Sequence, residues 1–476
     1  MNWSYHHYLR SIASLSTVLA ILILGTEYQT TTMAYKPEMN STWKASVGSS
    51  QAFNRIEEMH YDKIQYRIAQ RLQKRLRSQG NRASPSIDDL ALAVLRRQSL
   101  LTRHTVVHFA TADNPDEAAW SVSAQRYPLW ISPMISLTEA AFVLNQPEIA
   151  RTFEREDVLH VDPPHDAILR SVQWSTNSKT ASRVEIEGIA KPGYLPDSNA
   201  IASAIVDALD SGETSTTVSL QQHQGSIINV SGEDLGDLQH WATGRSNYKG
   251  SPTARKYNVQ YALNDHVNNT IVASEQVYSF NSTLDGPVNQ GNGWRMAKVI
   301  FNGGDLELAP GGGICQASTT LFRAAVLAGL PIIERRAHSL YVTYYKEYGV
   351  GIDATIFPGS QDLTFRNDSG KPLIVQAYNI GDDAFVSIYG SPDGRTVSLD
   401  GPYFASTAPD GYLYNGRTLS SREIVWQQNV VYPDGTDRSY QIGSLYKSLP
   451  ASLAREFEPQ TTVHAAAQVA RAGEDQ

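Results

Sequence analysis

The sequence predicts an exported α+β protein made of several domains. Its 476 residues are enough for roughly three domains at about 150 residues each. Helical spacing and strand alternation of apolar residues both recur along the chain, and an uncharged apolar stretch lies near the N-terminus. Apolar residues make up 41% of the chain, so each domain has enough of them to bury a core.

Residues 1–26 are expected to be a signal peptide or a membrane anchor. Ser11–Thr26 holds no charged side chain. A stretch of this length suits the apolar region of a signal peptide and is short for a spanning helix of about 20 residues. No small-x-small cleavage motif follows, so cleavage and an uncleaved anchor both stay open. We expect an exported protein, anchored in the membrane or located in the cell wall or outside the cell, with a polar linker over residues 27–50.

Residues 51–160 are expected to form an α-rich globular region whose role the sequence does not name. A first helix is predicted by apolar residues at helical spacing, namely Ile56, Ile64, Ile68, Leu72 and Leu76. Ser86 is predicted to cap a second helix over Ile87–Leu101, with Asp89 three residues later. Thr105–Phe109 is predicted as a strand and Leu137–Leu144 as another helix.

Residues 161–240 are expected to form a small α+β module. Arg183–Ala190 alternates apolar and polar residues like a strand, and Ser198 is predicted to cap the helix that follows. The core face of that helix is expected to contain Ile201, Ile205 and Leu209. Thr216–Leu220 is predicted to return as a strand. A strand–helix–strand unit of this size suits a binding or spacer module.

Residues 381–460 are expected to be rich in β-structure, because short apolar stretches alternate there with turn sequences. The turns share a Pro-Asp-Gly motif, at residues 392–394, 409–411 and 433–435. Residues 461–476 are rich in alanine and polar residues and are expected to be a disordered tail.

The charge distribution argues against nucleic acid as a partner. The net charge is −8 over 476 residues, whereas a phosphate-binding face needs concentrated Lys and Arg. Residues 67–82 are locally basic. They are interpreted as the solvated face of a helix, and contact with an anionic envelope polymer or a lipid surface is the alternative.

The densest chemical signal is the segment Pro310–Phe322, in which three glycines precede Cys315, the single cysteine of the chain. Successive glycines permit positive φ angles and close backbone approach. Helical spacing begins at Gln316, so Cys315 is predicted at a helix N-terminus, where the macrodipole stabilises a thiolate. The N–H groups of Cys315 and Gln316 are predicted to form an oxyanion hole. Gly312 and Gly313 are expected to belong to the same binding site.

His338 and Asp353 are the predicted partners of Cys315. His338 is expected in the next strand, and Asp353 on another strand candidate, Gly351–Phe357. A histidine base and a carboxylate that orients it would activate the thiol, and Asp362 competes with Asp353 for the third role. The order Cys, His, Asp is that of papain-like and transglutaminase-like enzymes. The competing interpretation is a small core cysteine behind a tight turn, with a structural histidine.

No cofactor, metal or nucleotide is predicted. Gly286–Gly291 has the glycine spacing of a phosphate loop, but Asn292 and Gly293 stand where that loop needs Lys and Ser or Thr. The chain also lacks the HExxH, CxxC and paired-histidine motifs that zinc sites use.

Residues 241–380 resemble the VanW family, named for an accessory protein of vancomycin-resistance clusters. The resemblance rests above all on Gly311–Leu321, which reads GGGICQASTTL. Further matching stretches are Ser279–Asn281, Gly286–Pro287, Ala328–Leu330, Glu334–Ser339, Asp353–Thr355 and Asp362–Leu363, with Arg255, Asn258 and Ala262 in a lead-in helix. The resemblance implies a bacterial cell-envelope protein associated with peptidoglycan, and it supplies no established reaction.

The module over residues 161–240 is similar to the peptidoglycan-binding domain that often precedes VanW domains. The matching residues are Val184–Gly188 and Pro192–Tyr194. This similarity implies peptidoglycan or its peptide stems as the partner, and the membrane is a second partner if the N-terminal segment stays uncleaved.

Three functions compete. The first is a Cys-His-Asp amidase, peptidase or acyltransferase that acts on amide or acyl bonds of peptidoglycan stem peptides. The second is a non-catalytic peptidoglycan-binding or cell-wall assembly module, in which the glycine turn binds a peptide carboxylate and Arg335 and Arg336 add positive charge. The third is a scaffold that holds an envelope complex through the N-terminal helices.

Overall fold

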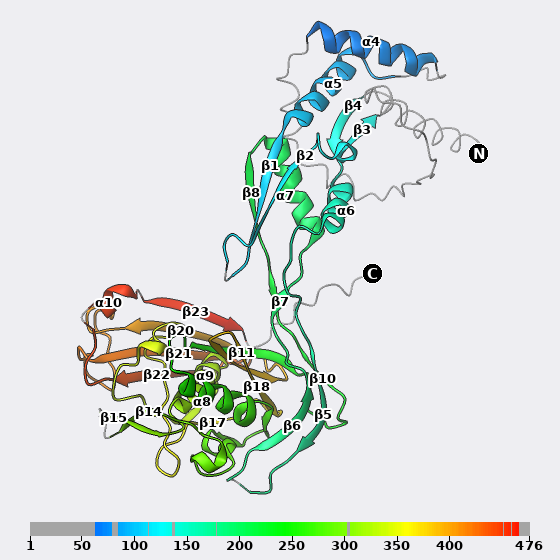
Figure 1. Cartoon of the computed structure of the whole chain (residues 1–476). Helices are drawn as coiled ribbons and strands as arrows, with labels where there is room; N and C mark the ends of the chain where they lie inside the picture. The colour runs from blue at the N-terminus through cyan, green and yellow to red at the C-terminus, as the bar shows by residue number, and fades with distance from the viewer. Residues whose placement is uncertain are drawn as a thin grey trace. The chain divides into compact units, whose positions relative to one another are not determined.

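The computed structural model describes residues 62–78, 84–112, 114–135, 139–177, 179–301, 305–450, 452–457 and 459–465. They fold into two compact units (Figure 1). Unit 1 contains the described residues up to Pro163 together with Tyr194–Gln222, and unit 2 contains Pro164–Gly193 and the described residues from His223 onward. The export segment and linker predicted over residues 1–50 lie outside the described residues. No helix within the described part of the chain is long and apolar enough to span a membrane.

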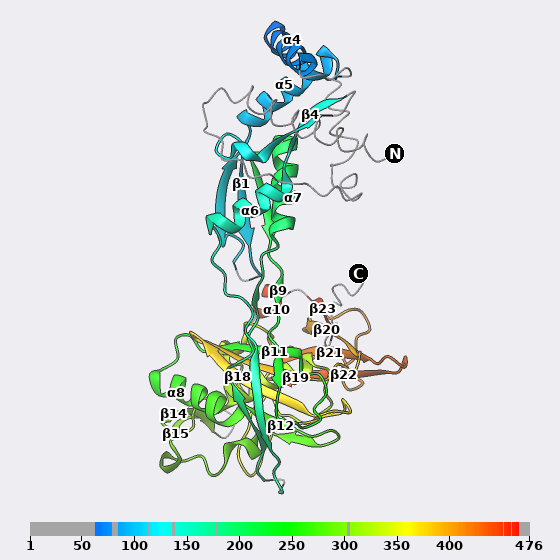
Figure 2. The same ribbon diagram turned by 90° about the vertical axis from the view of Figure 1, so that its right-hand side faces the viewer.

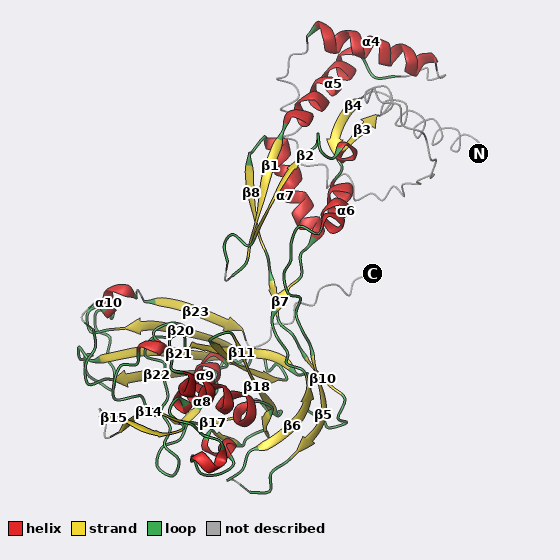
Figure 3. Cartoon of the chain, viewed as in Figure 1, coloured by secondary structure: helices red, strands yellow, loops and turns green. Residues whose placement is uncertain are grey.

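Helices and strands occur in both units, which confirms the α+β prediction (Figure 3). The helices of unit 1 are α4 (Lys63–Ser78), α5 (Ile87–Thr102), η1 (Pro128–Trp130), α6 (Gln146–Glu156) and α7 (Ser198–Ser211). Its strands are β1 (His104–Ala110), β2 (Ala118–Ser123), β3 (Ile131–Ile135), β4 (Ala140–Leu144) and β8 (Ser215–Ser219). β1 pairs antiparallel with β2 and parallel with β8, and α7 lies beside β1 in two views (Figures 1 and 2).

Helix starts in unit 1 follow local signals. Ser86 caps α5 through a reciprocal pair of hydrogen bonds with Asp89, as predicted. In α7 the cap is Asp197 rather than Ser198, because the Asp197 carboxylate accepts from the N–H groups of the second and third helical residues. The helix therefore begins one residue earlier than the predicted cap implied.

The helix predicted over Leu137–Leu144 is wrong. Ala140–Leu144 forms β4, which pairs antiparallel with β3 along its full length. A short apolar stretch satisfies the spacing of a helix and of a strand equally well, so its partner decides the outcome.

Unit 2 is built on a seven-stranded sheet with the order β10-β5-β6-β12-β18-β19-β11. Its strands are β5 (Ala167–Gln173), β6 (Ser182–Glu187), β10 (Ile227–Asn229), β11 (Gln239–Asn247), β12 (Thr270–Val272), β18 (Leu373–Ile380) and β19 (Asp383–Gly390). The helix α9 (Ile314–Leu327) packs against β11 and β19. The predicted lead-in helix is α8 (Thr253–Tyr261), which continues into the π-helix η2 (Ala262–Val267).

Shorter elements complete this part of unit 2. They are β13 (Val277–Ser279), η3 (Asn281–Leu284), η4 (Gln290–Asn292), β14 (Met296–Phe301), β15 (Asp305–Pro310), β16 (Ile332–Glu334), η5 (Thr343–Tyr345) and β17 (Thr364–Arg366). β14 and β15 pair as a hairpin that leads directly into α9. β13, β17 and β16 form a small three-stranded sheet.

A four-stranded sheet with the order β22-β21-β20-β23 follows, as the β-rich prediction required. Its strands are β20 (Thr396–Tyr403), β21 (Glu423–Val431), β22 (Asp437–Leu445) and β23 (Gln460–Ala465), with α10 (Leu453–Glu456) before the last strand. The prediction of a disordered tail over residues 461–476 is therefore wrong for its first five residues, because residues 461–465 pair with β20. Residues 466–476 lie outside the described part of the chain.

The strand–helix–strand module predicted over residues 161–240 is divided between the units. β6 pairs with β5 and β12 in the sheet of unit 2, whereas α7 and β8 belong to unit 1. The short strands β7 (Gly193–Tyr194) and β9 (Gln222–His223) lie where the chain passes from one unit to the other. Alternation identifies a strand, but it does not specify which strand will be its neighbour.

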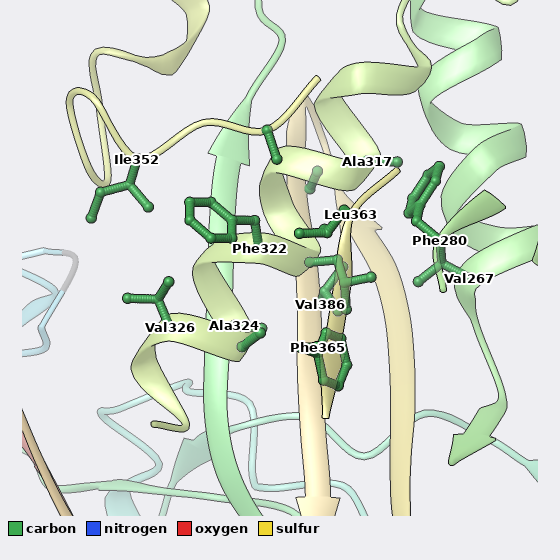
Figure 4. Close-up of a cluster of buried hydrophobic side chains, with 14 of the residues drawn as sticks. Val267, Phe280, Ala317, Phe322, Ala324, Val326, Ile352, Leu363, Phe365 and Val386 are labelled. Carbon is green, nitrogen blue, oxygen red and sulfur yellow. The ribbon is translucent and has the colours of Figure 1, made fainter. Parts of the chain in front are cut away.

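The main core of unit 2 surrounds α9. Buried residues lie on every side of this helix, which is typical of a helix enclosed by other elements. Figure 4 shows Ala317, Phe322, Ala324 and Val326 of α9 together with Phe365 of β17 and Val386 of β19. Close packing on all sides holds the helix in place, and with it the side chains at its N-terminus.

Candidate active site

Cys315 lies at the N-terminal end of α9, as predicted. Gly313 is the N-cap residue, with a φ of 117° that favours glycine, so Cys315 is the second residue of the helix. A Cβ atom on Gly312 would lie 2.7 Å from the carbonyl carbon and oxygen of Ala297 in β14. Gly312 and Gly313 therefore let the turn pack closely against its neighbours, and they place the thiol at the positive end of the helix.

The Cys315 thiol faces three polar groups. Its Sγ atom lies 3.5 Å from Oγ1 of Thr355 and 3.6 Å from the carbonyl oxygen of Ile356. The imidazole of His338 also acts on the thiol and lowers its pKa. Cys315 is a partly exposed residue, and protein groups contact its sulfur.

The structure brings His338 and Asp353 together with Cys315. Oδ2 of Asp353 accepts a hydrogen bond from Nδ1 of His338 and another, 2.9 Å long, from the backbone N–H of His338. Because Asp353 occupies Nδ1, the ring nitrogen left for the thiol is Nε2. His338 is not on the predicted strand, since β16 ends at Glu334.

Residues 351–357 form a loop rather than the predicted strand. The carbonyl oxygen of Ile352 accepts from Nε of Arg323 at 3.0 Å, and that of Asp353 accepts from Nε of Arg335 at 2.6 Å. Side chains thus take the place of a neighbouring strand as hydrogen-bond partners, and they fix the backbone that carries the Asp353 carboxylate.

Asp362, the competing candidate for the third role, has other partners. Its carboxylate accepts from Oγ of Ser279 at 2.5 Å and from the backbone N–H groups of Asn281 and Leu363. These bonds tie the end of β13 to the residues just before β17. Asp353 is therefore the carboxylate that orients His338.

A second layer of groups holds Asp353, which is only 1% exposed. Its other oxygen, Oδ1, accepts from the hydroxyl of Tyr446 at 2.6 Å and lies 3.5 Å from Nη2 of Arg335. Arg335 also donates to the carbonyl oxygen of Gly443 and to Oγ of Ser444. The predicted substrate role of Arg335 does not fit this geometry, because protein acceptors surround a side chain that is 7% exposed.

Gln316 and Arg336, two other predicted binding residues, differ in their surroundings. The backbone N–H of Gln316 donates to the carbonyl oxygen of Gly313 at 2.9 Å, which removes it from the predicted oxyanion hole. The N–H of Cys315 has no acceptor among the residues that the structure describes, so it is the available donor. Arg336 is exposed, and its backbone bridges to Thr355, which contacts the thiol.

The three central groups titrate as a coupled set. Burial alone would raise the pKa of Cys315, but the hydrogen bond and charge of His338 bring it below its ordinary value. Burial would lower the pKa of His338, yet Asp353 and Cys315 together raise it to about 9. Burial would raise the pKa of Asp353, and its bond to His338 instead lowers it to about 2. At neutral pH an imidazolium therefore lies between a carboxylate and an easily ionised thiol.

The sequence patterns did not identify three residues that support this site. Tyr446 carries no local signal, since 93 residues separate it from Asp353. Arg323 did carry a local signal, because it is the single charged residue of α9 and a buried charge needs partners. Arg255 donates to Oε1 of Gln316 at 2.8 Å and lies over the ring of Tyr344 at 4.6 Å.

A family model described as "VanW like protein" matches residues 254–389. Residues 254–389 are thus similar to the VanW family, and we call them the VanW domain. This span contains Cys315, His338 and Asp353, and it extends the VanW domain past the predicted end at residue 380 to include β19. Tyr446 lies outside the VanW match, so a residue of the C-terminal sheet region supports a site within the VanW domain.

The chain is also similar to a curated protein, the uncharacterized protein YoaR of Bacillus subtilis (strain 168). The two are 32% identical over 144 residues, which make up 30% of this chain and 46% of YoaR. The chain thus spans less than half the length of that relative. No solved structure matches the chain.

Replacing Tyr446 by phenylalanine should weaken the support of Asp353. The variant removes a hydrogen bond to a buried carboxylate, which typically contributes about 1.5–3 kcal/mol. We expect a loss of stability of about 2 kcal/mol, a higher pKa for Asp353 and a higher pH for half-maximal alkylation of Cys315. Chemical denaturation and the pH dependence of alkylation measure the two effects.

Tyr341→Phe is the matched control for Tyr446→Phe. The Tyr341 ring packs edge-on against Tyr446 with a centroid distance of 5.8 Å, and the Tyr341 hydroxyl has no hydrogen-bond partner among the described residues. Loss of the Tyr341 hydroxyl should leave the pH dependence of Cys315 alkylation unchanged. Equal profiles for the native protein and Tyr446→Phe would show that Asp353 does not depend on the C-terminal sheet region.

Proposed function

We propose that the VanW domain is the catalytic part of a bacterial cell-envelope enzyme that uses Cys315 to cleave or transfer amide bonds of peptidoglycan stem peptides. The observation that carries this proposal is the buried Asp353 carboxylate, which orients His338 toward a thiol at the positive end of α9. A core cysteine with a purely structural role needs no such pair beside it. Peptidoglycan as the substrate, and the envelope as the location, rest on the likeness to the VanW family.

In the proposed reaction the Cys315 thiolate attacks the carbonyl carbon of the scissile amide, and the N–H of Cys315 donates to the oxyanion. The C–N bond then breaks, and the His338 imidazolium gives its proton to the leaving amine. The acyl group stays on Cys315 as a thioester. Water or an amine attacks that thioester while neutral His338 takes the proton of the attacking group. The acid or the new amide then leaves, and the Cys315 thiolate is restored.

The surroundings of the thiol suit a substrate that carries a carboxylate. Arg336 is exposed on the segment that pairs with Thr355, and Thr355 contacts the thiol. Stem peptides present free carboxylates near their amide bonds, and a guanidinium binds a carboxylate through two parallel hydrogen bonds. Arg336 is therefore the residue that we assign to substrate recognition, in place of the buried Arg335.

The decisive experiment incubates purified peptidoglycan sacculi with the native protein and with Cys315→Ser. We expect the native protein to release new amino groups, or to join added amines to stem peptides, and the variant to do neither. Mass spectrometry of digested sacculi identifies the bond. The two proteins should melt at similar temperatures, because the replacement exchanges a single side-chain atom.

A different result would indicate a binding module. If the native protein binds sacculi without changing any bond, and Cys315→Ala binds equally well, the enzyme proposal is wrong. The glycine turn would then serve as a pocket for a peptide carboxylate at the N-terminus of α9.

A further inference from the structure

The helix α4 of unit 1 carries charge of one sign. Its sequence holds six cations and neither Asp nor Glu: Lys63, Arg67, Arg71, Lys74, Arg75 and Arg77. All six are exposed. Four of them, Lys63, Arg67, Arg71 and Arg75, are spaced four residues apart, which places them in one row along the helix. We call these four residues the basic row. Over its 12-residue span the row is about 18 Å long.

The basic row is unfavourable for the helix by itself. Like charges four residues apart repel one another and weaken a helix. None of the six cations has an acidic partner among the residues that the structure describes. The helix therefore carries a cost that a solvated face with mixed charges would avoid, and a negatively charged partner would offset it.

The opposite face of α4 is already occupied. Ala69, Leu72 and Leu76 are buried in the core of unit 1, together with Leu90 and Val94 of α5. The basic row lies outside this buried face, and its four side chains are exposed. At the N-terminal end of α4, Ile64 is 61% exposed and Tyr66 is 36% exposed, next to Lys63 and Arg67.

We propose that the outer face of α4 binds the surface of an anionic lipid bilayer. The basic row matches the negative charge of phosphate headgroups, and the exposed Ile64 and Tyr66 match the apolar layer just beneath them. A soluble phosphate polymer would neutralise the cations but would offer nothing to Ile64. This inference is independent of the chemistry proposed for Cys315, because it concerns unit 1 alone.

The test measures binding of the full chain to vesicles of phosphatidylglycerol and, separately, to vesicles of phosphatidylcholine at low salt. The triple variant Arg67→Gln, Arg71→Gln, Arg75→Gln should bind the anionic vesicles about 100-fold more weakly, since each cation contributes several-fold near such a surface. Binding to the neutral vesicles should not change, so any contribution of residues 11–26 cancels in the comparison. Gln favours helices about as well as Arg, and the repulsion is removed, so the melting temperature should stay the same or rise.

Two further variants separate the alternatives. The triple variant Lys179→Gln, Lys249→Gln, Lys298→Gln removes the same net charge from exposed positions of unit 2, and it should bind anionic vesicles like the native protein. Ile64→Ser should weaken vesicle binding several-fold and leave binding to soluble polyphosphate unchanged. Equal losses in the two triple variants would overturn the proposal. So would full vesicle binding by Ile64→Ser combined with tight, Arg-dependent binding to polyphosphate, which would point to a soluble polymer.

Discussion

Replacing His338 by alanine is expected to slow the alkylation of Cys315 by iodoacetamide at pH 7 by about 100-fold, because thiolate concentration sets the rate. The hydrogen bond and charge of His338 lower the pKa of Cys315 against the effect of burial. Without them, burial acts unopposed and raises that pKa above its ordinary value. The thiolate fraction at pH 7 then falls sharply.

The pH dependence of Cys315 alkylation shows in which direction His338 shifts the pKa of the thiol. In the native protein His338 stays protonated until the pH approaches about 9, and below that pH its charge favours the Cys315 thiolate. Alkylation should therefore begin at a lower pH than for an ordinary thiol. An activity that needs the His338 proton for the leaving amine should decline as the pH rises through about 9.

The measurement has a simple readout, because Cys315 is the single cysteine. Asp353→Asn should shift the alkylation profile in the same direction as His338→Ala, since it removes the carboxylate whose hydrogen bond raises the pKa of His338 most. His240→Ala is the control: His240 is a partly buried histidine of unit 2 that contacts Thr243 rather than the site. A thiol that reacts only after unfolding, in native and variant alike, would favour the structural interpretation of Cys315.

Replacing Arg323 by methionine is expected to destabilise unit 2 by about 4 kcal/mol and to lower its melting temperature by about 10 °C. Arg323 is 2% exposed. Its guanidinium donates to five backbone carbonyl oxygens, those of Arg245, Tyr345, Glu347, Gly349 and Ile352. Methionine fills a similar volume but donates to none of them, so several buried acceptors lose their partner.

The same variant should also change the chemistry of Cys315. Four of the five carbonyls lie in residues 345–352, the segment directly before Asp353. When that segment loosens, Asp353 no longer holds His338 in place, and half-maximal alkylation of Cys315 should move to higher pH. Differential scanning calorimetry and alkylation profiles measure the two effects on one sample.

Arg395→Met is the matched control for Arg323→Met. Arg395 is also a buried arginine, 1% exposed, but it pairs with Asp368 and Asp393 and donates to the carbonyl oxygen of Gly329 at the other end of α9. Its loss should destabilise unit 2 as well and leave the alkylation profile in place. Identical alkylation shifts in the two variants would mean that the profile reports general loosening rather than the position of Asp353.

The sequence determined those features that depend on neighbours a few residues away. Ser86 and Asp89 predicted the start of α5, and the glycine turn predicted that Cys315 opens a helix. Both are local, because a cap satisfies N–H groups within one helical turn. The pairing of Cys315 with His338 and Asp353 was also predicted, from the residue types and their order along the chain.

Only the tertiary structure decided which groups hold that site together. It selected Asp353 over Asp362, placed Arg335 beside the carboxylate, and brought in Tyr446 from beyond the VanW domain. It also divided the module predicted over residues 161–240 between two units. One physical reason explains both results. Hydrogen bonds and strand pairs between distant segments leave no periodic pattern in the sequence, because they depend on how the folded chain brings those segments together.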